Sequence, residues 1–294
     1  MHNRIIRWIA IQLAAIVTII ALGLIILGEI VTGPAPTAVE TLLPDFPVEQ
    51  VRIPAGDAYA VHGWLARGSY GKGALLLVHS MRSNRLEMLS RARFLNQQGY
   101  SVLMIDLQAH GETPGERITF GAREKADVTA ATAYLRDTFP HERIGAIGVT
   151  LGAAAILLAD PPLWLDALVL ESLHPTLAEA VENRLRLHLG DYGAYLKFLL
   201  LPYLSLLLDL PLEALDPINR IGTLTAPVLL VAGTLDKHTT QAEAERLYAA
   251  IQSPKELWIV EGAGHYNMHT YAGRTYEARI LEFLSSHLQR RQAN

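Results

Sequence analysis

The 294-residue sequence contains no cysteine. Disulfide bonds, thiolate metal sites and cysteine nucleophiles are therefore excluded. The sequence also lacks an excess of basic residues: 25 lysines and arginines stand against 29 aspartates and glutamates, a formal net charge of −4 at pH 7. This balance does not provide the basic surface that is typical of nucleic-acid-binding proteins, so we expect no nucleic-acid partner.

Long apolar runs, by contrast, are present. Half of the residues are hydrophobic, and after Arg4 and Arg7 the chain is almost entirely apolar as far as Leu27. This stretch is long enough to cross a bilayer, so residues 1–31 are predicted to form a single transmembrane anchor. A signal peptide is the alternative, but its apolar core would be shorter, and no clear cleavage site appears before Ala38. The two arginines place the N-terminus in the cytoplasm and the rest of the chain outside it.

Beyond the anchor, residues 32–47 contain four prolines and are predicted to form a stiff linker that leads away from the membrane. Residues 48–294 then alternate between short apolar strands and helices. Strands are expected at 48–53, 60–66, 74–78, 101–105, 144–149, 167–170, 227–231 and 256–260, and helices at 85–98, 123–138, from 151 onward, at 241–251 and at 275–290. This alternation predicts one α/β domain with a mostly parallel sheet and helices on both faces.

The alternation breaks between about residues 173 and 221, where no strand is expected. Apolar helical stretches are densest at 195–210. A second membrane span is the alternative interpretation, but Pro202 lies inside the run and the uninterrupted apolar lengths are too short. We therefore predict a helical cap, which either extends the core or forms a lid whose apolar side chains line a substrate pocket. The lid interpretation assigns this lining to leucines and the phenylalanine between Leu196 and Leu208.

The most informative segment is Gly148-Val149-Thr150-Leu151-Gly152, between an expected strand and an expected helix. It has the form of the G-x-S-x-G nucleophile elbow, in which a serine lies on a tight strand-to-helix turn. Threonine takes the place of the serine. The hydroxyl is retained, but a methyl group is added at a position where the backbone of the elbow is unfavourable for a β-branched residue.

Three further motifs follow expected strands. His79-Ser80-Met81 comes after residues 74–78, Asp236 follows 227–231, and His265 follows 256–260. In an open α/β sheet, ligands bind beyond the carboxyl ends of the strands. The order of hydroxyl, acid and histidine along the chain is the order of the α/β-hydrolase triad.

On these motifs, the sequence from about Val48 to Leu288 resembles the α/β-hydrolase superfamily, particularly bacterial esterase-like and serine-aminopeptidase-like members with a cap. The resemblance implies the α/β-hydrolase fold and hydrolysis of an ester or related acyl bond without a cofactor or metal. It places Thr150 at the nucleophile, Asp236 at the triad acid and His265 at the general base. The same resemblance implies that the backbone N–H groups of Met81 and Leu151 form the oxyanion hole.

The sequence departs from the family pattern at Ser80, where the family usually has glycine, so the oxyanion loop is expected to have a different shape. Glu171 is the alternative triad acid. His265 and His269 have the spacing of a helical metal-binding pair, but no third ligand accompanies them. His79 and His110 are interpreted as histidines that brace loops.

Two functions remain open from the sequence. The first is a membrane-anchored hydrolase that acts on a substrate with an apolar acyl group, with low activity because Thr150 replaces serine. The second is a non-catalytic binding protein that uses the same pocket for a hydrophobic ligand or a protein partner. A threonine introduced into an ordinary serine hydrolase is a further alternative.

Overall fold

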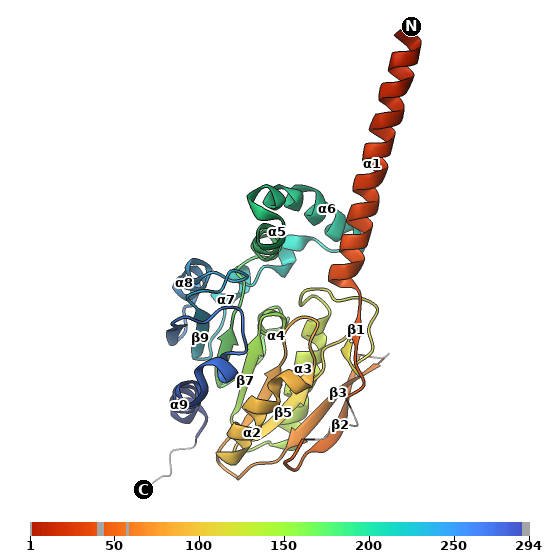
Figure 1. Ribbon diagram of the computed structural model, residues 1–294. Helices are drawn as coiled ribbons and strands as arrows, with labels where there is room; N and C mark the ends of the chain where they lie inside the picture. Colours follow the sequence, from red (N-terminus) through yellow and green to blue (C-terminus); the bar gives the residue numbers. More distant parts are fainter. Residues whose placement is uncertain (1, 40–43, 57–58, 290–294) are drawn as a thin grey trace.

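The computed structural model describes residues 2–39, 44–56 and 59–289. Residues 40–43 of the predicted linker and 290–294 of the predicted domain lie outside the described residues. An eight-stranded sheet forms the centre (Figure 1). Its strands are β2 (Glu49–Ala55), β3 (Tyr59–Ala66), β4 (Ala74–Val78), β5 (Ser101–Ile105), β7 (Ile144–Val149), β8 (Ala167–Glu171), β9 (Val228–Gly233) and β10 (Lys255–Val260). Their order is β10-β9-β8-β7-β4-β5-β3-β2.

The central strands are buried along their whole length because they are continuous apolar runs, as is typical of a parallel sheet covered on both faces. Strand β3 runs antiparallel to both of its neighbours, β2 and β5, and the other described strand pairs of this sheet are parallel. Register brings the carboxyl ends of the parallel strands to one edge, since Val149 pairs with Glu171 and Val260 pairs with Gly233. The predicted α/β fold with a mostly parallel sheet is confirmed.

Helices cover both faces of this sheet. The core cluster on one face includes α3 (Glu124–Thr138), α4 (Leu151–Leu157) and α8 (Gln241–Ala250), and the cluster on the other face includes α2 (Leu89–Gln97) and α9 (Met268–Leu288). The predicted helix at 85–98 begins as the 3₁₀ turn η1 (Arg85–Met88). Helix α9 starts earlier than predicted and bends at Gly273, which has a φ of 50°.

The inserted segment forms a helical cap, coloured green to cyan in Figure 1. It contains α5 (Leu177–Gly193), η2 (Ala194–Leu196), α6 (Lys197–Leu208), η3 (Leu212–Leu215) and α7 (Ile218–Ile221). Helix α5 begins where the Thr176 side chain accepts a hydrogen bond from the Glu179 N–H. Leucines of α5 and α6 form a third apolar cluster.

Helix α1 (His2–Thr32) extends away from the domain (Figure 1). Its most apolar 18-residue window has a mean hydropathy of 2.8, and none of that window is buried. The other end is docked, because the Thr32 carbonyl accepts the Ile118 N–H and strand β1 (Ala35–Pro36) pairs with β6 (His110–Gly111). The first residues of the predicted linker 32–47 therefore lie against the domain.

Candidate active site

The turn between β7 and α4 has the backbone form of a nucleophile elbow. Thr150 has a φ of 47° and a ψ of −99°, a conformation that strains a β-branched residue by about 1–3 kcal/mol. A Cβ at Gly152 would lie 2.5 Å from the carbonyl oxygen of Val78, and one at Gly148 would lie 2.7 Å from the nitrogen of Ala153. Only glycine fits at these two positions, so the elbow requires both.

The structure brings the predicted acid and base together. Asp236 lies in the loop after β9, and His265 lies in the loop after β10. The Asp236 carboxylate accepts a hydrogen bond from Nδ1 of His265 over 2.8 Å. Because an ionised carboxylate is only an acceptor, the proton is on Nδ1, and Nε2 is left as the basic nitrogen. This is the orientation that a general-base histidine needs.

Asp236 is held in its charged form. Burial alone would raise its pKa, but the hydrogen bond and charge of His265 and the N–H groups of Thr239 and His238 together bring the pKa below its usual value. These two N–H groups donate to the second carboxylate oxygen over 3.0 and 2.8 Å. The imidazolium that forms when His265 accepts a proton would therefore face a fixed negative charge.

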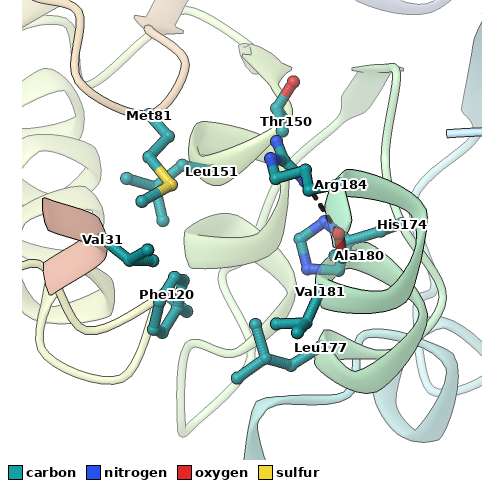
Figure 2. A pocket seen from close by; sticks show the side chains of 10 residues that line it. All are labelled: Val31, Met81, Phe120, Thr150, Leu151, His174, Leu177, Ala180, Val181 and Arg184. Carbon is teal, nitrogen blue, oxygen red and sulfur yellow. Dashed lines mark hydrogen bonds between the residues drawn. The ribbon is translucent and has the colours of Figure 1, made fainter. Parts of the chain in front are cut away.

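The Thr150 hydroxyl does not complete this arrangement. Thr150 is 4% exposed, and its Oγ1 has no hydrogen-bond partner among the described residues. Figure 2 shows this oxygen turned away from the side chains that line the pocket. The structure therefore places Thr150 in the elbow without a hydrogen bond to His265.

The loop after β4 approaches the elbow. Met81 and Leu151, whose N–H groups are the predicted oxyanion hole, both line the pocket beside Thr150. Leu151 is the first residue of α4, where N–H groups have no partner within the helix. Ser80 does not have a positive φ; Arg82 does, at 58°. Serine is therefore compatible with the backbone at position 80, and a loop shape that differs from the family's stays a prediction.

Comparisons with known proteins show the family of this chain. Residues 59–278 match the Alpha/beta hydrolase family. The chain belongs to the α/β-hydrolase family. The uncharacterized protein Rv2307c of Mycobacterium tuberculosis is 32% identical over 260 residues, which cover 86% of this chain and 84% of that protein. The uncharacterized protein YqkD of Bacillus subtilis is 26% identical over 242 residues, which cover 80% and 78%.

Among solved structures, the esterase Pf2001 of Pyrococcus furiosus has a TM-score of 0.69 at 24% identity. The match covers 87% of this chain and 98% of the esterase chain. This likeness shows a shared esterase-like fold.

The pocket of this α/β-hydrolase lies between the elbow and the cap, and its volume is about 50 Å³. Its lining consists of Val31, Met81, Phe120, Thr150, Leu151, His174, Leu177, Ala180, Val181 and Arg184. The cap contributes through α5, so the prediction that side chains between Leu196 and Leu208 line the pocket is wrong. Helix α6 turns Leu200, Leu204 and Leu208 into its cluster with α5, and Phe198 and Leu206 are exposed.

The alternative triad acid, Glu171, is engaged elsewhere in the hydrolase core. Its buried carboxylate accepts hydrogen bonds from the Arg91 guanidinium and from the Tyr276 hydroxyl. These three fully buried side chains join β8 to α2 and α9. The structure therefore pairs Asp236, and not Glu171, with His265.

His79, His110 and His269 each hydrogen-bond to other parts of the chain. His79 Nδ1 donates to the Ser80 carbonyl and Nε2 accepts the Leu107 N–H, while His110 Nδ1 donates to the Gln108 carbonyl and Nε2 accepts the Arg82 N–H. Both rings brace loops beside the elbow. His269 hydrogen-bonds to Ser90 and Glu277. Within the described residues, no group of three or more metal-ligating side chains is present.

Two polar side chains in the pocket, His174 and Arg184, were missed by the sequence reasoning. His174 follows β8, so the rule that ligands bind beyond strand ends would have found it. Arg184 lies in the middle of α5 and belongs to no motif, and only its burial against the elbow distinguishes it from the surface arginines of the cap.

Proposed function

We propose that this protein is a membrane-anchored hydrolase that cleaves an ester or related acyl bond of a substrate with an apolar acyl group. The observation that carries the proposal is the Asp236–His265 hydrogen bond beside a nucleophile elbow. The esterase-like fold and the apolar side chains that make up most of the pocket lining support it.

In this mechanism, the Thr150 hydroxyl rotates toward His265 and attacks the acyl carbon while Nε2 of His265 accepts its proton. The N–H groups of Met81 and Leu151 stabilise the oxyanion, each contributing about 3 kcal/mol where such donors have been measured. His265 then delivers the proton to the leaving group as the acyl bond breaks. In the second step, His265 takes a proton from a water molecule that attacks the acyl-enzyme, and it returns this proton to the Thr150 oxygen as the acid product leaves. Asp236 holds the imidazole tautomer throughout.

Helix α1 supports the membrane part of the proposal. It is exposed, apolar and long enough to span a bilayer, and Val31 at its end lines the pocket. The pocket therefore lies next to the proposed membrane surface, where apolar acyl substrates are found. Arg4 and Arg7 place the N-terminus in the cytoplasm and the hydrolase domain outside it.

The unpartnered Thr150 hydroxyl favours a second candidate, a non-catalytic protein that binds a hydrophobic ligand or protein partner in the same pocket. A fluorophosphonate probe separates the two candidates because it labels only an activated, accessible nucleophile. We expect slow labelling of the purified protein that is lost in Thr150→Ala and in His265→Ala. Labelling that is absent under conditions that label a serine esterase, in folded protein, would favour the binding function.

A further inference from the structure

Arg184 is an unpaired charge in the wall of the pocket. Its guanidinium makes one hydrogen bond, of 3.3 Å, to the carbonyl of Ala180 on the same helix. Within the part of the chain that the structure describes, no carboxylate lies within ion-pair distance of it. Figure 2 shows the guanidinium between Thr150 and the His174 ring. The guanidinium is half-buried, and a charged group that is partly removed from water needs a partner, because desolvation without one is unfavourable.

His174 adds a second unsatisfied group on the same side. It is 6% exposed, and neither ring nitrogen has a hydrogen-bond partner among the described residues. Burial, together with the nearby charges of Arg184 and His265, lowers the pKa of His174 to about 3. The ring is therefore neutral at physiological pH and offers one N–H donor and one acceptor.

Asp236 does not supply the missing partner. Burial lowers the pKa of Arg184, and the charge of Asp236 opposes this only in part. One oxygen of Asp236 accepts from His265 and the other accepts from two backbone N–H groups. The remaining lining, apart from Thr150, is apolar. On this side of the pocket, the Arg184 guanidinium and the His174 N–H thus have no anionic partner among the described residues, and together they are the complement of an anionic ligand.

We propose that Arg184 and His174 form a subsite for an anionic group, a carboxylate or a phosphate, carried by the acyl substrate. This inference deepens the proposed function and rests on it for the nature of the substrate. Val31, Met81 and Phe120 lie on the opposite side of the pocket and accept the apolar part (Figure 2). The substrate class is an acyl compound with a negative charge close to the bond that is cleaved, such as an anionic lipid or a soluble ester of a diacid.

Binding measurements test the subsite without requiring catalysis. Isothermal titration of the full-length protein in nonionic detergent would compare octyl phosphate, octanoate and octanol, which share one apolar chain. We expect at least one of the anions to bind at least about tenfold more tightly than octanol, as expected for hydrogen bonds to a charged group. Competition by phosphatidate in mixed micelles would indicate that the subsite binds a lipid phosphate. A preference for octanoate without such competition would indicate that it binds a soluble carboxylate.

Arg184→Gln should abolish the preference for the anion over octanol. Arg186→Gln is the matched control, because Arg186 lies two residues away on the same helix but is exposed and paired with Glu182 and Asp191. Arg184→Gln should also keep or raise the melting temperature, since it removes an unpaired charge. A structural role for Arg184 predicts the opposite change in stability.

The two proposals fail separately. If anions bind no better than octanol, or if Arg184→Gln keeps the preference, the subsite is wrong even if the protein hydrolyses neutral esters. If the anion preference depends on Arg184 while fluorophosphonate labelling is absent, the subsite stands and the proposed hydrolase activity fails.

Discussion

At the scale of single residues, Thr150 determines how well the machinery works. The proposed acid and base, Asp236 and His265, are hydrogen-bonded to each other, whereas the Thr150 hydroxyl has no hydrogen-bond partner among the described residues. We expect Thr150→Ser to raise kcat/KM toward p-nitrophenyl esters at least about tenfold, equivalent to ~1.4 kcal/mol of transition-state stabilisation. The methyl group restricts χ1 and crowds the attacking position, where about 1 Å of misplacement can reduce the rate a hundredfold.

Steady-state kinetics of the two proteins measure this change, and His265→Ala in the Thr150→Ser background should remove the gain. The melting temperature should stay equal or rise, because serine tolerates the positive φ of 47° better than a β-branched residue does. A folded Thr150→Ser protein without any gain in rate would contradict the triad assignment.

The buried Arg91–Glu171 pair is a second test at this scale. Arg91 is fully buried, and it hydrogen-bonds to Glu171 and Tyr276. Replacing it with methionine leaves a buried carboxylate without its cation, so Arg91→Met should lower the free energy of unfolding by about 3–5 kcal/mol. Urea denaturation would measure the loss.

Arg93→Met is the matched control, because Arg93 lies on the same helix and pairs with Asp45 in an exposed ion pair. Its loss should be at most about 1 kcal/mol. Equal losses in the two variants would show that the buried pair contributes no more than a surface one.

At the scale of elements, the sequence predicted the central strands to within about two residues because each is a short apolar run bounded by polar or glycine residues. It did not predict β1 or β6, since two residues that pair across the chain leave no periodic pattern. The early start of α9 was missed because Gly273 interrupts the helical pattern and marks a bend.

The sequence also predicted only part of the candidate site. Thr150, Asp236 and His265 follow strands and could be found from the chain order, and their positions depend on backbone topology. The pocket wall could not be predicted, because the apolar residues of α5 and α6 satisfy the same pattern. Only packing decides that α5 lines the pocket while α6 packs against α5 and α1.

The loops beside the elbow should make the protein sensitive to acid. His110 accepts the Arg82 N–H through Nε2, a bond that protonation breaks. Burial, followed by the charges of His79 and Arg82, lowers its pKa to about 4, against about 6.5 in the unfolded chain. Between these values the unfolded state binds more protons, so stability falls as the pH decreases from about 6.5 to 4.

Urea denaturation at several pH values checks this dependence. His110→Asn should be less stable at neutral pH, and its stability should decline less steeply between pH 6.5 and 4. His188→Asn, at an exposed position of α5, is the control and should keep the slope of the unaltered protein. An unchanged slope in His110→Asn would contradict the role assigned to this histidine.

At the scale of the whole molecule, α1 and the hydrolase domain form a continuous structure. Glu29 pairs with Arg117 over 2.7 Å, and the Arg82 guanidinium donates to the carbonyls of Ile30 and Gly33. Arg82 belongs to the loop that carries the proposed oxyanion donor Met81. The end of the proposed membrane helix is thereby linked to the active-site loop.

Orientation in the membrane is testable on the intact chain. Arg4 and Arg7 precede the apolar stretch, so we expect a retained anchor with the C-terminus outside the cytoplasm. Alkaline phosphatase fused after Asn294 should be active, because it matures only outside the cytoplasm, and a cytoplasmic reporter at the same site should be inactive. The reverse result would contradict the orientation, and a mature N-terminus near Val39 would show that the segment is cleaved.

The docking of α1 predicts that two truncations have different effects on the domain. Leu24, Leu27 and Val31 pack against the cap cluster, whereas the side chains of residues 4–22 are exposed. Deleting residues 1–23 should weaken membrane association and leave the melting temperature of the domain within a few degrees of the full-length value.

Deleting residues 1–33 also removes these apolar contacts, the Glu29–Arg117 ion pair and the hydrogen bond to the Thr32 carbonyl. These three side chains are half-buried, so each contributes less than the about 1.5–3 kcal/mol of a fully buried aliphatic side chain. Together with the lost polar contacts, their removal should lower the melting temperature of this second form by on the order of 5–10 °C. Scanning calorimetry of the two forms in the same detergent measures the difference. Equal melting temperatures would show that α1 is only a tether, and that the pocket wall supplied by Val31 is dispensable for the fold.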